Sequence, residues 1–146
     1  MIFKEKRIIH KVLESLFKTY SERVPDVKKI TSGLIEHKVI EKQDDIINDH
    51  IAFRTLGVKY LGIQSLEKIF IHHGYVKRDY YNFDKKKLNA YWYSHPKKNM
   101  PRIFISELRV NDLSTKTRNI IKKYTSQLKY DPVKNLNLNS YNKIIE

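Results

Sequence analysis

The stretch from Asp49 to Gly57 holds the residue types best suited to chemistry. His50, Ala52 and Arg54 alternate along an otherwise apolar run, so in a β-strand they share one face. An imidazole can bind a metal ion, and a guanidinium can bind a carboxylate through two parallel hydrogen bonds. The pair therefore predicts a site for an anionic substrate held beside a metal ion. The same spacing also fits an ordinary strand whose polar face meets water, and the pattern alone does not separate the two.

Length and composition indicate one folded domain. The chain has 146 residues, of which 40% are hydrophobic and 12% aromatic, enough to form a core without cross-links. It has no cysteine, which excludes disulfides, thiolate metal sites and a cysteine nucleophile. Any metal ligand must therefore be His, Asp, Glu or water. Because no apolar run is long enough to span a membrane and the first residues do not resemble a signal peptide, we expect a cytoplasmic protein without a membrane partner.

The net charge of +13 is typical of proteins that bind nucleic acid. The lysines are nevertheless spread along the whole chain, and the one run of three, Lys85–Lys87, falls in an expected hairpin turn. The sequence has no helix-turn-helix, zinc-finger or RNA-recognition signature. It also lacks a glycine-rich phosphate loop, a Gly-x-Ser-x-Gly elbow and a His-Glu-x-x-His helix. Nucleic acid is therefore not the expected partner.

Hydrophobic periodicity predicts two N-terminal helices, over residues 3–22 and 25–42, which form a helical segment 1–43. Apolar side chains recur in both at spacings of three and four, and Pro25 suits the first turn of the second helix. His10 lies on the first of these helices, where a surface or rim position is expected rather than a role as a metal ligand.

Residues 44–128 predict an α+β fold. Period-two patterns indicate strands over 48–56, 75–83, 88–94 and 102–110, and period-3.6 patterns indicate helices over 64–73 and 112–128. The order is therefore one β-α-β-β-β unit, a curved and half-open mixed sheet followed by a further helix. Gly74 is expected to end the helix 64–73, and Ser114 or Asp112 to begin the last helix. Trp92 is expected in the core, and residues 129–146 are expected to form a linker or a frayed tail.

Four motifs follow one another along this part of the chain: Asp49–Thr55, Gly74–Tyr75 with Arg78–Phe83, Leu88–Trp92, and Pro101–Leu108. In this order and spacing they resemble the 2-oxoadipate dioxygenase/decarboxylase family, also called hydroxyglutarate synthase, a branch near the vicinal-oxygen-chelate superfamily. The resemblance runs from about residue 45 to residue 125. It implies a vicinal-oxygen-chelate-like sheet.

The resemblance also implies an activity and a site. In that family two histidines and one glutamate hold a non-haem Fe(II), and 2-oxoadipate is oxidatively decarboxylated with O₂ to 2-hydroxyglutarate. His50 then corresponds to the first metal-binding histidine, and Arg54 to an arginine that binds a substrate carboxylate. Two histidines and one carboxylate leave positions on iron open for a 2-oxo acid and O₂.

The sequence carries only part of this pattern. In the family the second histidine and the glutamate lie in a later half, beyond the helix at 113–128, and this sequence stops at Glu146. Glu107, on the fourth strand, is a candidate metal ligand, and pairing with a nearby arginine is the alternative. We expect the iron site to be completed by a second copy of the chain, as a homodimer, or by a separately encoded C-terminal half.

Three hypotheses follow. The first is a domain, or N-terminal half, of an Fe(II)-dependent enzyme acting on a small 2-oxo dicarboxylic acid and O₂. The second is a non-catalytic remnant or binding module that keeps the fold without the metal site. The third is a basic nucleic-acid-binding protein, which only the charge supports.

Overall fold

The computed structural model describes residues 7–145, which divide into two compact units. One unit holds the residues up to Asn48 together with those from Asn137 onward, and the other holds Asp49–Leu136. The second unit contains every residue proposed above for the site. No helix among the described residues is long and apolar enough to cross a lipid bilayer.

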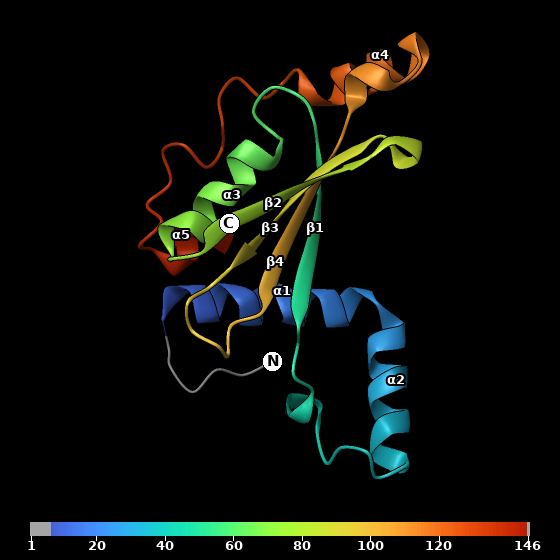
Figure 1. The fold of residues 1–146 in the computed structure, drawn as a ribbon, viewed down its shortest axis with the longest axis vertical. Coiled ribbons are helices and arrows are strands. Elements are labelled where there is room, and N and C mark those ends of the chain that lie inside the picture. Colours follow the sequence, from blue (N-terminus) through green and yellow to red (C-terminus); the bar gives the residue numbers. More distant parts are fainter. Residues whose placement is uncertain (1–6, 146) are drawn as a thin grey trace. The chain divides into compact units, whose positions relative to one another are not determined.

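The first unit is helical (Figure 1). Its helices are α1 (Ile8–Arg23), α2 (Pro25–Glu36) and the short α5 (Tyr141–Ile145), and α1 contacts both of the others. Pro25 is the first residue of α2, where its missing N–H removes no helical hydrogen bond. His10 is 2% exposed, so the surface or rim position expected for it was wrong. It lies one turn before the buried Leu13 and shares its stripe of the helix.

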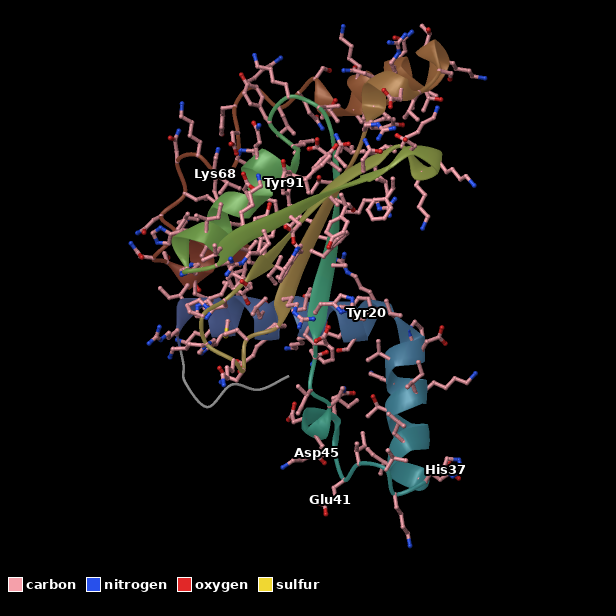
Figure 2. The ribbon with its side chains drawn as sticks, in the orientation of Figure 1. Tyr20, His37, Glu41, Asp45, Lys68 and Tyr91 are labelled. Carbon is pink, nitrogen blue, oxygen red and sulfur yellow. The ribbon has the colours of Figure 1, made fainter. Side chains whose placement is uncertain are left out.

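Helix α2 ends at Glu36, earlier than the predicted residue 42. Lys38 has a φ of 56°, in the left-handed region. The backbone N–H of Val39 donates to Leu34 O and that of Lys38 donates to Ile35 O, both at 2.9 Å. These two bonds form a Schellman motif, which closes a helix. In the loop beyond it, Asp45 Oδ2 accepts the backbone N–H groups of Glu41 and Lys42, each at 2.9 Å (Figure 2).

The second unit is the expected β-α-β-β-β run. Its elements are β1 (His50–Leu56), α3 (Ile63–His72), β2 (Val76–Phe83), β3 (Leu88–Ser94), β4 (Arg102–Leu108) and α4 (Thr115–Thr125). The strand order is β1-β4-β3-β2, with β1 parallel to β4 and the remaining pairs antiparallel (Figure 1). The mixed sheet and its following helix are therefore confirmed.

Helix α3 covers one face of the sheet. The ring centroids of Phe53 in β1 and Phe70 in α3 are 5.5 Å apart, and Tyr93 Oη in β3 donates to Glu67 Oε2 in α3 at 2.6 Å. Ile103 and Ile105 of β4 are fully buried on this face. Because side chains alternate along a strand, the even-numbered residues of β1 and β4 point to the opposite face.

The helix ends in this unit follow the sequence signals. Gly74 has a φ of 92° directly after the α3 cap, as expected. Ser114 is the residue before α4, and its hydroxyl accepts the backbone N–H of Thr117 at 3.3 Å. Of the two caps considered, the structure therefore uses Ser114. Helix α4 itself buries no residue and extends away from the end of β4 (Figure 1).

The segment after α4 differs from the expected linker or frayed tail. Asp131 accepts hydrogen bonds from Ser65 Oγ at 2.6 Å and from Lys68 Nζ, both on α3. It also accepts the backbone N–H of Val133 at 2.9 Å, and Val133 is buried. These bonds attach the segment to α3, so the expectation was wrong here. Sequence periodicity did not reveal this because the contacts join residues more than 60 positions apart.

Candidate functional site

A cavity of about 640 Å³ opens beside His50 on the sheet face opposite α3. It is formed by the first residues of β1 and β4 and by side chains of β2 and β3. The lining residues are Asp49, His50, Ala52, Tyr81, Trp92, Arg102, Ile103 and Phe104. The cavity therefore combines one imidazole, one guanidinium and one carboxylate with a largely aromatic wall.

The strand register brings these groups together. His50 lies opposite Arg102 and Ala52 lies opposite Phe104 in the parallel β1–β4 pair, while Trp92 lies opposite Phe104 in the β3–β4 pair. Neighbouring strands are about 4.8 Å apart. Residues more than 40 positions apart in the sequence therefore stand side by side on one face.

The carboxylate of Asp49 contacts both the imidazole of His50 and the guanidinium of Arg102. Its Oδ2 lies 3.2 Å from His50 Nδ1, and its two carboxylate oxygens lie 3.4 and 3.5 Å from Arg102 Nη1. The His50 and Asp49 side chains are 62% and 69% exposed. An imidazole whose Nδ1–H donates to a carboxylate keeps an unprotonated Nε2, whose lone pair can bind a metal ion. This is the usual arrangement for a metal-binding histidine.

Arg54 lies on the same face as His50, two side chains further along β1. Four residues of strand correspond to about 13 Å between their Cα atoms. The Arg54 guanidinium has no hydrogen-bond or ion-pair partner among residues 7–145, and the side chain is exposed. It is therefore available to bind an anion, although it does not line the cavity beside His50.

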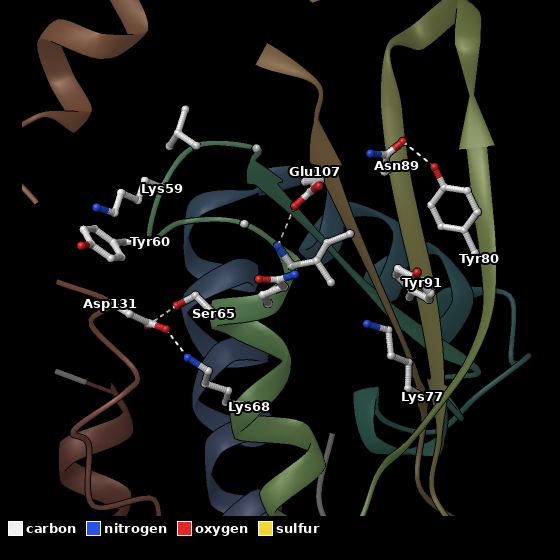
Figure 3. Close-up of a pocket in the computed structure, with 15 residues that line it drawn as sticks. Lys59, Tyr60, Ser65, Lys68, Lys77, Tyr80, Asn89, Tyr91, Glu107 and Asp131 are labelled. Atoms are coloured by element: carbon white, nitrogen blue, oxygen red, sulfur yellow. Dashed lines mark hydrogen bonds and ion pairs between the residues drawn. The ribbon is translucent and has the colours of Figure 1, made fainter. Parts of the chain in front are cut away.

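Glu107 does not join this group. It is paired with Thr55 in the strand register, which places it on the α3 face of the sheet, opposite to His50. Its Oε2 accepts the backbone N–H of Ile63 at 2.9 Å, so it caps the first turn of α3 (Figure 3). Within the described chain His50 and Glu107, the two candidate metal ligands, do not converge. Glu107 pairs with Thr55, which is an odd number of positions from His50 along β1, so the two side chains lie on opposite faces of the sheet. Within residues 7–145 Glu107 also has no arginine partner, which contradicts the alternative expectation.

A second cavity, of about 710 Å³, lies on the α3 face around Glu107 (Figure 3). Its polar side chains are largely paired with one another. Asp131 binds Ser65 and Lys68, and Tyr80 Oη donates to Asn89 Oδ1 at 2.8 Å. Lys77 Nζ lies 3.8 Å from the ring centroid of Tyr91. These contacts join the segment after α4 to α3, and β2 to β3.

Sequence reasoning predicted His50 and Arg54 as site residues, and it did not place Asp49, Arg102 or the aromatic residues of the cavity wall beside His50, where the structure has them. Trp92, expected in the core, is half-buried in this wall, and its Nε1 donates to Asp79 Oδ2 at 3.0 Å. The core position expected for it was therefore wrong. The sequence did contain one relevant signal, because Arg102 and Phe104 are two positions apart in β4 and therefore lie on one face. Periodicity could not show which strand pairs with β4.

Comparison with known proteins shows what the chain is similar to. A family model described as 2-oxoadipate dioxygenase/decarboxylase matches residues 12–139. A chloroplastic/amyloplastic 2-oxoadipate dioxygenase/decarboxylase of Oryza sativa is 40% identical over 123 residues, which cover 77% of this chain and 33% of the relative. A chloroplastic protein of the same description from Arabidopsis thaliana is 35% identical over 127 residues, which cover 78% of this chain and 33% of the relative.

Solved structures agree with these matches. The hydroxyglutarate synthase of Oryza sativa in complex with 2-oxoadipate aligns with a TM-score of 0.69 and 39% identity over 79% of this chain and 39% of that one. A putative hydrolase of Shewanella frigidimarina aligns with a TM-score of 0.74 and 29% identity over 92% and 49% of the two chains. A glyoxalase-superfamily protein of Ralstonia eutropha shares the fold, with a TM-score of 0.71 at 20% identity over 92% and 44% of the two chains. These likenesses confirm a vicinal-oxygen-chelate-like fold.

The matches cover most of this chain but only part of each relative. The chain spans about a third of the length of the two plant relatives. About two thirds of each relative therefore has no counterpart in the matched part of these 146 residues.

Proposed function

The chain belongs to the 2-oxoadipate dioxygenase/decarboxylase family, and we propose that it contributes His50 and Arg54 to an Fe(II)-dependent enzyme that converts 2-oxoadipate and O₂ to 2-hydroxyglutarate and CO₂. The observation that carries the proposal is the placement of His50 and Arg54 on one exposed sheet face beside a cavity. The rice structure, solved with 2-oxoadipate, supports the substrate class.

The described residues supply one iron ligand and do not form a complete iron site. Among residues 7–145 no group of three His, Asp or Glu side chains is placed to hold a metal ion. His50 suits the role of one ligand, because Asp49 faces its Nδ1 and leaves Nε2 directed elsewhere. We propose that the remaining ligands come from a second copy of the chain or from a further half such as its longer relatives contain. When bound, iron would supply the one-electron chemistry that a reaction with O₂ requires.

The chain's own residues would bind and orient the substrate. Arg54 presents a planar guanidinium that can hold a carboxylate through two parallel hydrogen bonds. The aromatic wall of Tyr81, Trp92 and Phe104 would contact the methylene carbons and keep water from that side of the substrate.

One observation favours a second candidate function. Of the two proposed metal ligands, His50 and Glu107, only His50 lines this cavity among the described residues. The chain therefore also fits a non-catalytic module that keeps the fold and binds an anion without turnover. The two candidates differ in their metal requirement.

The experiment that separates them is trans-complementation. The purified chain is assayed for Fe(II)-dependent O₂ consumption with 2-oxoadipate, alone and after addition of the part of the rice relative that this chain does not match. We expect turnover in at least one of these mixtures, and we expect His50→Ala to abolish it. If neither mixture consumes O₂ and Fe(II) leaves the thermal stability unchanged, the enzymatic proposal is wrong and the binding module remains.

A further inference from the structure

We propose that a third cavity, between the loop after β1 and helix α4, binds a polyphosphate, a small anion that carries several negative charges. The cavity measures about 440 Å³, within the size range of small-molecule sites. It lies at the end of β1 away from His50, because β1 begins at His50 and the loop begins at Gly57. Six residue steps of strand correspond to about 20 Å. The proposal is therefore independent of the proposed function.

The strand pairing places this cavity at one edge of the sheet. Because β1 and β4 are parallel, their carboxyl ends, Leu56 and Leu108, lie side by side. The backbone N–H of Gly57 donates to Leu108 O at 2.9 Å, which holds the loop beside the end of β4. Helix α4 follows β4 after one 3₁₀ turn, Val110–Asp112, and supplies the other wall. The crevice outside the carboxyl ends of parallel strands is a common place for a ligand.

One face of α4 forms the second wall. Four residues of the helix line the cavity at spacings of three and four: Arg118, Ile121, Lys122 and Thr125. Residues at these spacings share one face of a helix. Lys116 and Lys123 belong to the same helix but do not line the cavity. The helix therefore divides its cations between the cavity and the solvent.

The cavity has three cationic side chains and no carboxylate. Lys59 comes from the loop (Figure 3), and Arg118 and Lys122 come from α4. The sequence from 113 to 130 contains five Lys or Arg residues and no Asp or Glu. Arg118 and Lys122 are also four positions apart, a spacing at which like charges destabilise a helix. A bound anion would relieve this repulsion.

The three cations are available to a ligand. Lys59 and Lys122 form no hydrogen bond or ion pair with any residue from 7 to 145, and Lys59 Nζ lies 4.8 Å from the ring centroid of Tyr60. Arg118 donates from Nη2 to Thr115 Oγ1 at 3.1 Å and keeps its other donors. A guanidinium can hold two phosphate oxygens through parallel hydrogen bonds, while an ammonium acts as a point charge. Three cations match at least three negative charges, which a chain of phosphate groups carries and a dicarboxylate does not.

Calorimetric titration of the full chain tests the proposal. Inorganic tripolyphosphate and inorganic phosphate are compared in about 0.15 M salt, which screens exposed charges beyond about 8 Å. We expect saturable one-to-one binding of tripolyphosphate, at least about tenfold tighter than that of phosphate, because it engages more than one cation. Adenosine triphosphate carries a phosphate chain of the same length and identifies the source, because only a nucleotide site binds it more tightly than tripolyphosphate.

Two double variants remove the same charge from the same helix. Arg118→Gln with Lys122→Gln takes two cations from the cavity and should weaken tripolyphosphate binding at least about tenfold. Lys116→Gln with Lys123→Gln is the matched control and should change the affinity less than about threefold. Lys59→Gln tests the loop and should weaken binding severalfold. All five side chains are exposed, and circular dichroism checks that each variant is folded.

Three results would overturn the proposal. The first is the absence of saturable tripolyphosphate binding up to about 1 mM. The second is an equal loss of affinity in the two double variants, because binding would then follow the overall charge of α4. The third is tighter binding of single-stranded oligothymidine that both double variants weaken alike, which would make α4 a nucleic-acid interface. None of these results depends on iron or on O₂ consumption, so failure here is distinct from failure of the proposed enzyme.

Discussion

The carboxylate of Glu107 accepts the backbone N–H of Ile63 at 2.9 Å and so joins the end of β4 to the first turn of α3. The first N–H groups of a helix have no partner within the helix, and a carboxylate there also favours the helix dipole. Glu107 therefore acts on the stability of the β-α-β-β-β unit, on the sheet face opposite to His50.

Glu107→Ala should lower the free energy of unfolding by about 1–2 kcal/mol, the usual cost of losing such a cap, and leave ligand binding at the His50 cavity unchanged. Urea unfolding measures the first quantity, and a titration with 2-oxoadipate followed by the fluorescence of Trp92, the single tryptophan of the chain and a lining residue of this cavity, measures the second. Glu22→Ala, at an exposed position of α1, is the control and should change neither. Weaker metal or ligand binding in Glu107→Ala at unchanged stability would instead assign Glu107 to the site.

Gly57→Ala should destabilise the same unit. A Cβ atom at Gly57 would lie 2.6 Å from the backbone oxygen of Leu108, and a backbone atom held in a sheet cannot move aside cheaply. We expect a loss of about 1–3 kcal/mol, typical of overpacking. Gly33→Ala is the matched change, because it meets nothing within 4 Å inside helix α2 and should stabilise that helix by up to about 1 kcal/mol. Equal thermal stability of the two variants would contradict the close approach at Gly57.

The stability of the chain should fall in acid partly through Asp131. Burial alone would raise the pKa of this carboxyl, but the hydrogen bonds from Lys68, Ser65 and the Val133 backbone outweigh burial and lower it. A carboxyl with a lowered pKa in the folded state stabilises the fold above its unfolded pKa, near 3.8, and loses this contribution as the pH falls through the folded value.

Asp131→Asn should therefore cost about 1–3 kcal/mol at pH 7, and the difference from the unaltered chain should shrink below about pH 4. Urea unfolding at several pH values measures this difference. A difference that stays constant down to pH 2.5 would show that the charge of Asp131 has no part in the effect.

In alkali Tyr93 is one such group. Burial, and then the hydrogen bond to Glu67, raise the pKa of its phenol far above the ordinary value of 10.0. The unfolded tyrosine ionises near pH 10 while the folded one stays neutral, so the stability that depends on Tyr93 is present below pH 10 and is lost as the pH rises above it.

Tyr93→Phe should cost about 1 kcal/mol at pH 8 through the lost hydrogen bond, and the unfolding free energy of this variant should decline less steeply between pH 10 and pH 11. Unfolding curves at these pH values provide the measurement. An unchanged slope would mean that Tyr93 ionises in the folded chain as it does in the unfolded one.

Much of this protein could be predicted from its sequence because the signals are local. The period of the apolar residues indicated each strand and each long helix, and a glycine and a serine marked the end of α3 and the start of α4. The alternation along β1 placed His50 and Arg54 on one face, which the structure keeps. The four motifs pointed to the family that the comparisons show.

What only the tertiary structure decided is which distant residues meet. The parallel pairing of β1 with β4 brings Arg102 beside His50 and places Glu107 on the opposite face. Local periodicity fixes the face of a side chain within its own strand, but the partner strand and its register depend on packing across the whole sheet. The sequence by itself therefore determined the elements and the pair His50–Arg54. Only the register decided that Arg102 lies on the sheet face of His50 and that Glu107 lies on the other face, because a shift of one residue moves every side chain of a strand to the other face.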